Sequence, residues 1–408
     1  MRKMQFLKTM KATLICVVIL SMSITTACSD DDNATTKKTP TPTTNGASMI
    51  SDPAKLDMIY SLVDLEGDKG RIYEMNYTVD YKLDDAINFG INGQAKLTQF
   101  VGAYLMDTPK SKSMSLTYDA GCSAFAAPDK STGNFLMGRN FDFNHRDKNS
   151  NRIDIPVIVV HTAPQGGKKS VSFVDGNFVN YKKGFYTETG NDLSMLMALP
   201  YLLLDGINED GFAISVLKLD GKPTRQTKSS QKTIFTTVAM RMLLDRASTV
   251  KEATAMLEKY NMCMDTDTAS YHFFMADATG DYAIVEYTGD NVNINNPKNM
   301  EVLRDNDTLR CVTNFYVSPT MVKTEFGGYS NHGRKRYKDL RDGLLKYNYN
   351  VTPSQALELL KIVAQGPEGS KSSTGYTQWS EVYNLTKRRL TLNLTREWDK
   401  TFEFGIEE

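Results

Sequence analysis

A cysteine, an arginine and an aspartate that could together attack an amide lie within one short stretch of this sequence. Cys122 follows a small residue, Gly121, and Arg139 and Asp142 stand on an apolar segment after a turn-rich spacer. If the two segments pair as a hairpin, the guanidinium and the carboxylate lie beside the thiol. Arg favours a thiolate and can polarise an amide carbonyl, whereas Asp can orient an amine and hold the guanidinium in place.

Such a nucleophile needs a base, and the four histidines of the chain give Cys122 no partner close by in sequence. A Cys–His pair formed by the fold is one source of that base. Cleavage of the Gly121–Cys122 bond is another, because it frees an α-amino group. That amine has a pKa of roughly 7.7–8 and can take the proton of the thiol at neutral pH. A third interpretation is a buried cysteine beside a structural Arg–Asp pair.

Cys122 followed by the string Gly138–Asp142 (GRNFD) resembles the linear-amide branch of the N-terminal nucleophile hydrolases. This branch includes choloylglycine (bile salt) hydrolase, penicillin V acylase, the acyl-CoA:6-aminopenicillanic acid acyltransferase group, acid ceramidase and N-acylethanolamine acid amidase. The string is most similar to the ceramidase and acyltransferase members. The resemblance implies an α+β fold, a four-layer αββα sandwich in which two stacked antiparallel sheets carry helices on both outer faces.

The resemblance also implies further site residues. Thr313-Asn314-Phe315 is similar to a strand whose Asn side chain donates a hydrogen bond to the oxyanion of the tetrahedral intermediate, so this role falls to Asn314. The string around Asn208 (DGINEDGF) is similar to a turn that precedes a substrate-facing strand. Ten residues on from Asn208, Lys218 stands where bile salt hydrolases carry an active-site Asn. A cation there changes what the pocket accepts, unless the side chain points away.

Bile salt hydrolases carry another active-site Arg near the start of a later helix, and the string Ser330–Tyr337 occupies that place here. Two residues are candidates for the role. The distance from Ser330 favours Arg334, and the aromatic neighbour favours Arg336. A basic helix start that faces solvent is an equally good interpretation.

The first 27 residues are typical of a lipoprotein signal peptide. Basic residues precede the apolar segment 12–24, which is too short for a comfortable membrane span. The string Thr25–Cys28 (TTAC) resembles a bacterial lipobox, so we expect Cys28 to be lipidated and to anchor the chain to the outer membrane. The catalytic domain then lies in the cell envelope, periplasmic or exposed on the surface. The alternative is an ordinary secreted protein cut near Ala27.

The rest of the chain divides into three parts. Residues 28–48 are rich in Thr, Pro and Lys and are expected to form a flexible tether. Residues 49–121 show helical patterns and are predicted to be a small folded pro-region, with folded sequence starting near Asp52. Residues 122–408 alternate hairpins with helices, which favours α+β over a parallel βαβ design. In this part, Leu202–Leu217 and Tyr271–Tyr287 each predict a hairpin.

The amino-acid composition limits the kinds of molecule that the protein is expected to bind. Lys+Arg and Asp+Glu number 48 each, so no basic excess points to nucleic acid. Two of the five cysteines fall in the export segment, and Cys263 and Cys311 are either small buried hydrophobes or a disulfide. No Rossmann, P-loop or zinc motif is present, so neither a cofactor nor a metal is expected. His145 lies near Asp142 and Asp147, where exposed turn residues are favoured over a metal site.

These observations together predict an enzyme made as a lipoprotein precursor and activated by cleavage before Cys122. Its substrate is a small-molecule N-acyl amide, hydrolysed through a thioester, with Asn314 and a backbone N–H holding the oxyanion. Transfer of the acyl group to another amine is one alternative. A surface lipoprotein that keeps the fold and binds a ligand without catalysis is another. The joint presence of Cys122, Arg139, Asp142 and Asn314 favours the enzyme.

Overall fold

The computed structural model describes most of the chain from residue 38 to residue 406. Within that span it leaves out the segments 109–113, 115–119, 265–268, 288–299, 305–309, 325–330 and 367–374, and the residues 68, 148, 150, 222, 223 and 227. The expected signal peptide and Cys28 therefore lie outside the described residues. In the described ranges, no helix has both the length and the apolar character that a membrane span requires.

The sheet that carries Cys122 has six strands, all paired antiparallel, in the order β14-β3-β4-β15-β16-β17. Its strands are β3 (Ala120–Pro128), β4 (Phe135–Phe143), β14 (Cys311–Val312), β15 (Tyr376–Asn384), β16 (Arg389–Leu394) and β17 (Phe402–Gly405). The predicted pairing of β3 with β4 as a hairpin is confirmed. Because β14 and β15 flank it, this hairpin lies in the interior of the sheet. One of its faces is covered by the second sheet and the other by helices.

The second sheet has nine strands in the order β1-β2-β5-β6-β7-β8-β11-β12-β13. Its strands are β1 (Val63–Asp64), β2 (Ile72–Tyr77), β5 (Val157–Thr162), β6 (Ser170–Asp175), β7 (Leu203–Asn208), β8 (Ala213–Asp220), β11 (Ala269–Ala276), β12 (Tyr282–Tyr287) and β13 (Met300–Leu303). Among these pairings, β2 with β5 is parallel and the others are antiparallel. The hairpins predicted for β7–β8 and β11–β12 are both confirmed.

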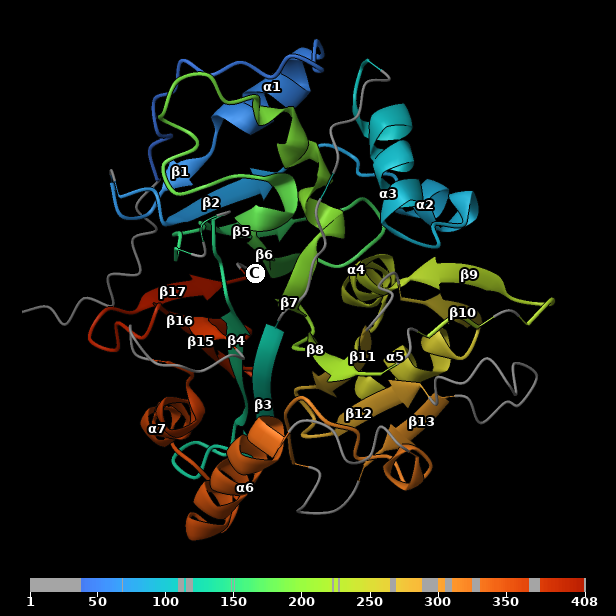
Figure 1. The fold of residues 1–408 in the computed structure, drawn as a ribbon, viewed down its shortest axis with the longest axis vertical. Coiled ribbons are helices and arrows are strands. Elements are labelled where there is room, and N and C mark those ends of the chain that lie inside the picture. Colours follow the sequence, from blue (N-terminus) through green and yellow to red (C-terminus); the bar gives the residue numbers. More distant parts are fainter. Residues whose placement is uncertain are drawn as a thin grey trace, which may run out of the picture. The chain divides into compact units, whose positions relative to one another are not determined.

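The two sheets stack, since β3 packs against β8 and β11 (Figure 1). Helices α6 (Asn331–Lys346) and α7 (Pro353–Val363) contact the six-stranded sheet through β3, β4, β14 and β15. Helices α4 (Thr236–Arg246) and α5 (Val250–Leu257) contact the nine-stranded sheet through β7, β8 and β12. The predicted α+β sandwich with helix, sheet, sheet and helix layers is therefore confirmed.

Local sequence explains how the β3–β4 hairpin turns. Both oxygens of the Asp129 side chain accept hydrogen bonds from the next residues, from Ser131 Oγ at 2.6 Å and from Thr132 Oγ1 at 2.6 Å. Gly133 takes the positive φ of 74° that the turn needs. Further along β4, a Cβ on Gly138 would lie 2.1 Å from the ring of Phe125. The GRNFD string therefore begins with glycine because β3 packs an aromatic ring against it.

Side chains cap two of the helices that cover the sheets. A capping box of Thr352 and Gln355 begins α7, and the Thr249 side chain caps α5. Helix α4 is directly preceded by strand β9 (Lys232–Phe235). This strand pairs in parallel with β10 (Tyr260–Cys263). Shorter helical turns are η2 (Gly176–Val179), η3 (Leu193–Tyr201) and η6 (Met321–Lys323).

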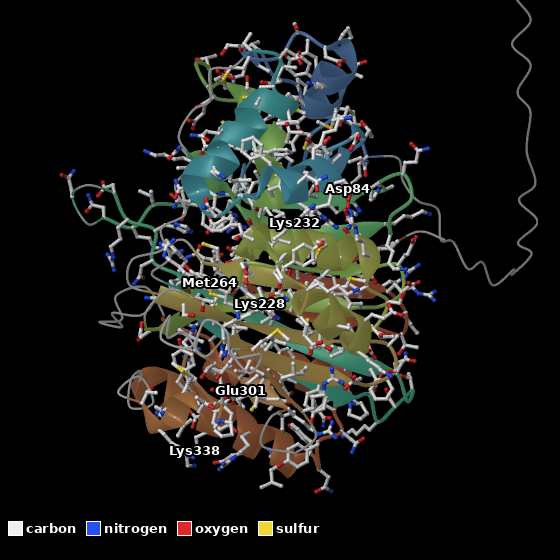
Figure 2. All side chains as sticks on the ribbon, turned by 90° about the vertical axis from the view of Figure 1, so that its right-hand side faces the viewer. Asp84, Lys228, Lys232, Met264, Glu301 and Lys338 are labelled. Atoms are coloured by element: carbon white, nitrogen blue, oxygen red, sulfur yellow. The ribbon has the colours of Figure 1, made fainter. Side chains whose placement is uncertain are left out.

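The segment before Cys122 is built into the fold. Its elements are α1 (Pro53–Tyr60), β1, β2, α2 (Leu83–Phe89), α3 (Gln94–Phe100) and the π-helical turn η1 (Val101–Leu105). Strand β2 is a full member of the nine-stranded sheet, and α2 packs against α4. Polar contacts extend this packing, with Asp84 2.7 Å from Arg246 and Asn88 2.7 Å from Lys232. Asp84 and Lys232 are labelled in Figure 2.

The expectation of a flexible tether up to residue 48 is wrong for its last residues. The Asn45 side chain is buried and donates to the carbonyls of Tyr186 at 2.9 Å and Glu188 at 2.7 Å. Thr41 N–H donates to the Leu62 carbonyl at 3.0 Å. A polar composition did not prevent folding here, because carbonyls from a distant loop satisfy the amide. Folded structure therefore begins near Thr41 and not near Asp52.

Candidate active site

Cys122 lies on β3 directly opposite Phe141 of β4, and its side chain is almost completely buried. The sulfur is 3.9 Å from the carbonyl oxygen of Val216 on β8, so it points into the layer between the two sheets. Burial raises the pKa of the thiol above its ordinary value, and the charge of Arg139 opposes that rise. In the uncut chain the thiol is therefore held protonated.

Arg139 lies beside this thiol, as the sequence predicts. Its guanidinium forms a hydrogen bond with Cys122 and donates from Nη2 to the Val216 carbonyl at 3.2 Å. Its Nε donates to Oδ2 of Asp205 on β7 at 2.6 Å, and both side chains are fully buried. The guanidinium is thus fixed between the thiol and a carboxylate from the opposite sheet.

The expectation that Asp142 holds this guanidinium is wrong. In the hairpin register, Arg139 faces Ala124 and Asp142 faces Gly121. Residues three apart on a strand project from opposite faces of the sheet. The two side chains therefore point into different layers, and the hydrogen-bonded carboxylate partner of Arg139 is Asp205.

Asp142 instead belongs to the layer between the six-stranded sheet and its helices. It accepts hydrogen bonds from Thr377 Oγ1 at 2.6 Å and Gln365 Nε2 at 2.7 Å. Arg336 Nη1 lies 3.7 Å from its carboxylate. Burial raises the pKa of Asp142, and Arg336 and the two hydrogen bonds oppose this rise. The carboxyl group thus stands opposite Gly121, the residue before the predicted cleavage point.

Asn314 and Arg336 hold the main chain of Cys122. The Cys122 N–H donates to Asn314 Oδ1 at 2.6 Å, and its carbonyl accepts from Arg336 Nη1 at 2.6 Å. Arg336 also donates to Asn314 Oδ1 at 2.7 Å and to Ser123 Oγ at 2.9 Å. The Asn314 Nδ2 group, which the oxyanion role requires, donates to the Lys218 carbonyl at 2.8 Å. Both of these side chains therefore contact the main chain of Cys122 directly.

Of the two candidate arginines on α6, the structure brings Arg336 to Cys122. Arg336 is buried, and burial lowers the pKa of its guanidinium, with Asp142 opposing this. Arg334 lies over the ring of Phe315, with its guanidinium carbon 4.5 Å from the ring centroid. The aromatic neighbour was thus a better guide to the buried arginine than the distance from Ser330.

Asn208 and Lys218 are the two predicted site residues of the β7–β8 hairpin, and neither brings its side chain to Cys122. Asn208 shapes the hairpin turn: its Nδ2 donates to the carbonyls of Leu244 at 3.0 Å and Ala247 at 2.7 Å. Lys218 reaches the site through its main-chain carbonyl, which Asn314 binds. Its ammonium group lies 3.5 Å from Asp220 Oδ1.

Sequence reasoning missed five residues that contact the predicted ones. Thr377 and Gln365 bind Asp142, and they are separated from it by more than 200 positions. Asp205 binds Arg139, and Glu381 and Tyr383 lie behind Asp205. The sequence held one indication of this contact. Trp379, Glu381 and Tyr383 occupy every second position of strand β15, so their side chains point to the same buried face. An acid at the middle of that pattern marks a polar contact inside the sandwich.

The remaining candidates are structural. His145 was expected to be an exposed turn residue, which is wrong, because it is buried 2.9 Å from Asp175. Cys263 and Cys311 are both buried and form no disulfide, so the disulfide alternative is wrong. Among the described residues, no group of His, Cys, Asp and Glu side chains is arranged to hold a metal ion.

The family follows from a match that begins at Cys122. Residues 122–325 match the model of the linear amide C-N hydrolases, choloylglycine hydrolase family, so the chain belongs to this family of hydrolases that act on carbon–nitrogen bonds in linear amides.

Among curated relatives, a penicillin V acylase from Pectobacterium atrosepticum is 32% identical over 114 residues. That match covers 26% of this chain and 30% of the relative, so it spans less than a third of the relative's length.

Solved structures with a similar chain trace include two enzymes. A mutant conjugated bile acid hydrolase from Clostridium perfringens has a TM-score of 0.46 at 15% identity, covering 70% of this chain and 92% of its own. A penicillin V acylase from Agrobacterium tumefaciens has a TM-score of 0.46 at 16% identity, covering 70% and 86%.

Proposed function

We propose that the protein hydrolyses the amide bond of small N-acyl compounds through a thioester on Cys122, after cleavage between Gly121 and Cys122. The observation that carries this proposal is that the three polar atoms of Cys122 have separate partners. Asn314 binds its nitrogen, Arg336 binds its carbonyl oxygen, and Arg139 lies at its sulfur. Family membership, with a match that starts at this same residue, supports it.

Cleavage begins with attack of the Cys122 thiol on the Gly121 carbonyl, where no side chain blocks the approach. The C–N bond breaks, the nitrogen takes the proton that the thiol loses, and the acyl chain is transferred to sulfur as a thioester. Water then hydrolyses the thioester, which releases the Gly121 carboxylate, a free thiol and a free α-amine. Asn314 Oδ1 accepts the Cys122 N–H before cleavage, and it can accept an N–H of that amine afterwards.

The amine then serves as the base during turnover. Its lone pair takes the thiol proton, and Arg139 stabilises the thiolate that attacks the substrate carbonyl. The leaving amine of the substrate takes the proton as its C–N bond breaks, and water hydrolyses the second thioester. Asn314 is proposed to donate to the oxyanion, which requires its Nδ2 to exchange the Lys218 carbonyl for the substrate.

The cleavage step is the direct test. Wild-type protein should give a fragment ending at Gly121 and one beginning at Cys122, seen by N-terminal sequencing and intact mass. Cys122→Ala should stay one chain and be inactive, and Cys122→Ser should cleave slowly and hydrolyse amides poorly. Cys263→Ser, a change at a buried thiol on β10, is the matched control and should cleave normally. A fully active enzyme with an intact Gly121–Cys122 bond would overturn the proposal.

For the substrate, we propose simple fatty or aromatic N-acyl amides in preference to taurine-conjugated bile salts. Lys218 stands where bile salt hydrolases carry an Asn, so this position supplies no side-chain amide, and its ammonium group lies 3.5 Å from Asp220 Oδ1 and not at Cys122. A panel of N-acyl amino acids, N-acylethanolamines, penicillin V and conjugated bile salts tests this preference. A higher kcat/KM for taurocholate than for every simple amide would contradict it.

We also propose that the chain is a lipoprotein anchored to the outer membrane through Cys28. The support is the lipobox-like string that ends at this residue. Cys28→Ala should no longer partition into detergent with the membranes. Partitioning identical to that of the wild type would exclude the anchor.

A further inference from the structure

Behind Arg139, a set of four ionisable side chains fills the layer between the two sheets. Arg139 comes from β4, Asp205 from β7, and Glu381 and Tyr383 from β15; we refer to them as the Arg139 cluster. All four are fully buried. Glu381 stands directly opposite Arg139 in the β4–β15 register, so both side chains enter the same layer. None of these contacts depends on which bond the enzyme cleaves.

The donors of the cluster are too few for two ionised carboxylates. Arg139 Nε donates to Asp205 Oδ2 at 2.6 Å. The Tyr383 hydroxyl has one hydrogen; its oxygen is 2.9 Å from Glu381 Oε2 and 3.4 Å from Asp205 Oδ1. No described residue donates a hydrogen bond to Glu381 Oε1, although this oxygen is buried. The carboxyl groups of Glu381 and Asp205 form a hydrogen bond with each other.

The charges lead to the same conclusion. Arg139 is the cation of the cluster, and Asp205 holds its Nε. On its own strand Glu381 stands between Tyr383 and Trp379, whose indole lies beside Asp205, and Leu392 stands opposite it on β16, so these neighbours add no cation. Cys122 contacts the far side of Arg139, and Arg336 lies in the other layer, beside Asp142. A second ionised carboxylate would be buried without a cation, which costs several kcal/mol.

We propose that Glu381 is a neutral carboxylic acid in the folded protein, which donates its proton to Asp205 and thereby positions the Asp205–Arg139 pair against Cys122. The proton accounts for the Glu381 oxygen that lacks a donor. Tyr383 then donates to the other oxygen, so every member of the cluster has a partner. Burial, followed by the charge of Asp205, raises the pKa of Glu381 well above its usual range, which agrees with this assignment.

The proton also sets the field at the nucleophile. With Glu381 neutral, Arg139 is balanced by one carboxylate, and the cluster has no net charge before the thiolate forms. An ionised Glu381 would add a negative charge that opposes the thiolate at Cys122. Glu381 does not itself touch the sulfur, so it is a positioning residue.

Stability against pH tests the proton without any substrate. A raised pKa means that the folded chain keeps a proton which the unfolded chain loses above roughly 4.3. The stability this proton gives is complete at low pH and is lost as the pH rises towards the folded pKa. Glu381→Gln, which is neutral at every pH, should therefore gain in Tm relative to wild type by about 1–2 °C per pH unit above pH 5.

Asp205→Asn is the matched variant with the opposite expectation. It removes the charge that Arg139 needs, so its Tm should fall below that of wild type at every pH above about 4. A Glu381→Gln protein that loses as much Tm as Asp205→Asn at pH 7 would show that Glu381 is ionised, and would overturn the proposal.

Infrared spectroscopy gives a second and direct measurement. The wild-type minus Glu381→Gln difference spectrum at pH 7 should contain the carbonyl band of a carboxylic acid, whereas a carboxylate band alone would contradict the proposal. If Glu381→Gln fails to fold, the same band should shift in Tyr383→Phe, which loses the donor to Glu381. An unshifted spectrum there would also contradict it. Turnover should fall in Glu381→Ala and be restored in Glu381→Gln.

Discussion

Two arginines of this protein each face two carboxyl groups, and the pKa of the acids shifts in opposite directions at the two places. Arg71 lies before the predicted cleavage point and donates to Glu66 at 2.6 Å and to Glu397 at 2.9 Å. Lys400 joins them, and the four form the Arg71 cluster. Three of its members reach solvent, since the side chains of Arg71, Lys400 and Glu397 are 17%, 42% and 45% exposed, whereas the Glu66 side chain is covered by them. The Arg139 cluster has a similar composition but no exposure at all.

The protonation of the two clusters differs accordingly. Burial tends to raise the pKa of Glu66, but hydrogen bonds from Arg71 and Lys400 outweigh it and lower the pKa to about 2. The pKa of Glu397 is lowered by its hydrogen bond to Arg71. In the Arg139 cluster, where a single cation faces two fully buried acids, the pKa of Glu381 rises. The Glu66 side chain is also covered, so the number of cations that face the acids decides whether an acid keeps its proton.

The largest expected effect separates the two arginines by stability. Arg139→Ala leaves the carboxylate of Asp205 buried without its partner and should lower the free energy of unfolding by about 3–5 kcal/mol. Arg71→Ala leaves Glu66 paired with Lys400 and leaves Glu397 in contact with water, so it should cost only about 0–1 kcal/mol. Urea unfolding of both variants in the Cys122→Ala background, where the chain stays uncut, measures the difference. Equal losses would mean that the two clusters are not distinct.

An effect of intermediate size is expected on the stability of the protein at low pH. The Arg71 cluster joins residues on both sides of the proposed cleavage point, so it would also link the two proposed fragments. Because the folded pKa of Glu66 lies below its unfolded value, the stability that it contributes is present above roughly pH 4.3 and is lost as the pH falls towards 2.

The matched variant for this effect is Glu66→Gln. The difference in Tm between wild type and Glu66→Gln should be greatest near pH 6 and shrink steadily towards pH 3. A difference that stays constant over this range would show that Glu66 stabilises the fold by packing and not by charge.

The smallest expected effect is the response to salt. A double-mutant cycle on Arg71 and Glu397 should give a coupling of about 0.2–1 kcal/mol, because the pair is partly exposed. Raising the ionic strength from about 0.05 M to 0.5 M should reduce it, since the Debye length shortens. The same cycle on Arg139 and Asp205 should be insensitive to salt. Salt-sensitive coupling in the buried pair would show that water reaches it.

Local signals predicted the elements around the nucleophile well. Turn residues and alternation placed the β3–β4 hairpin, and the resemblance of short strings pointed to Asn314 and to an arginine on α6. The pairing of Arg139 with Asp142 was the avoidable error. Three positions on a strand place two side chains on opposite faces, which the sequence alone could have revealed.

The partners of the site were beyond local reasoning. Asp205 and Arg139 are 66 positions apart and meet because the two sheets stack, and no periodicity encodes which strands lie across from each other. Composition misled at Asn45 for a related reason. A Thr- and Pro-rich segment is expected to stay unfolded, but its amide fits a loop that lies more than 140 positions later in the chain.

The parallel pairing of β2 with β5 has a consequence for how the enzyme can be produced. A gene that begins at Cys122 would encode the nucleophile but would leave β5 as the border of the nine-stranded sheet. Residues 157–160 (VIVV) would then offer unpaired N–H and C=O groups on a flat apolar ribbon, the kind of edge that recruits other chains. In the whole chain, β2 pairs with this edge, and the sheet ends at β1, which has only two residues and so offers few unpaired backbone groups. The segment before Cys122 therefore protects against aggregation, and recombinant protein that lacks it should collect in inclusion bodies.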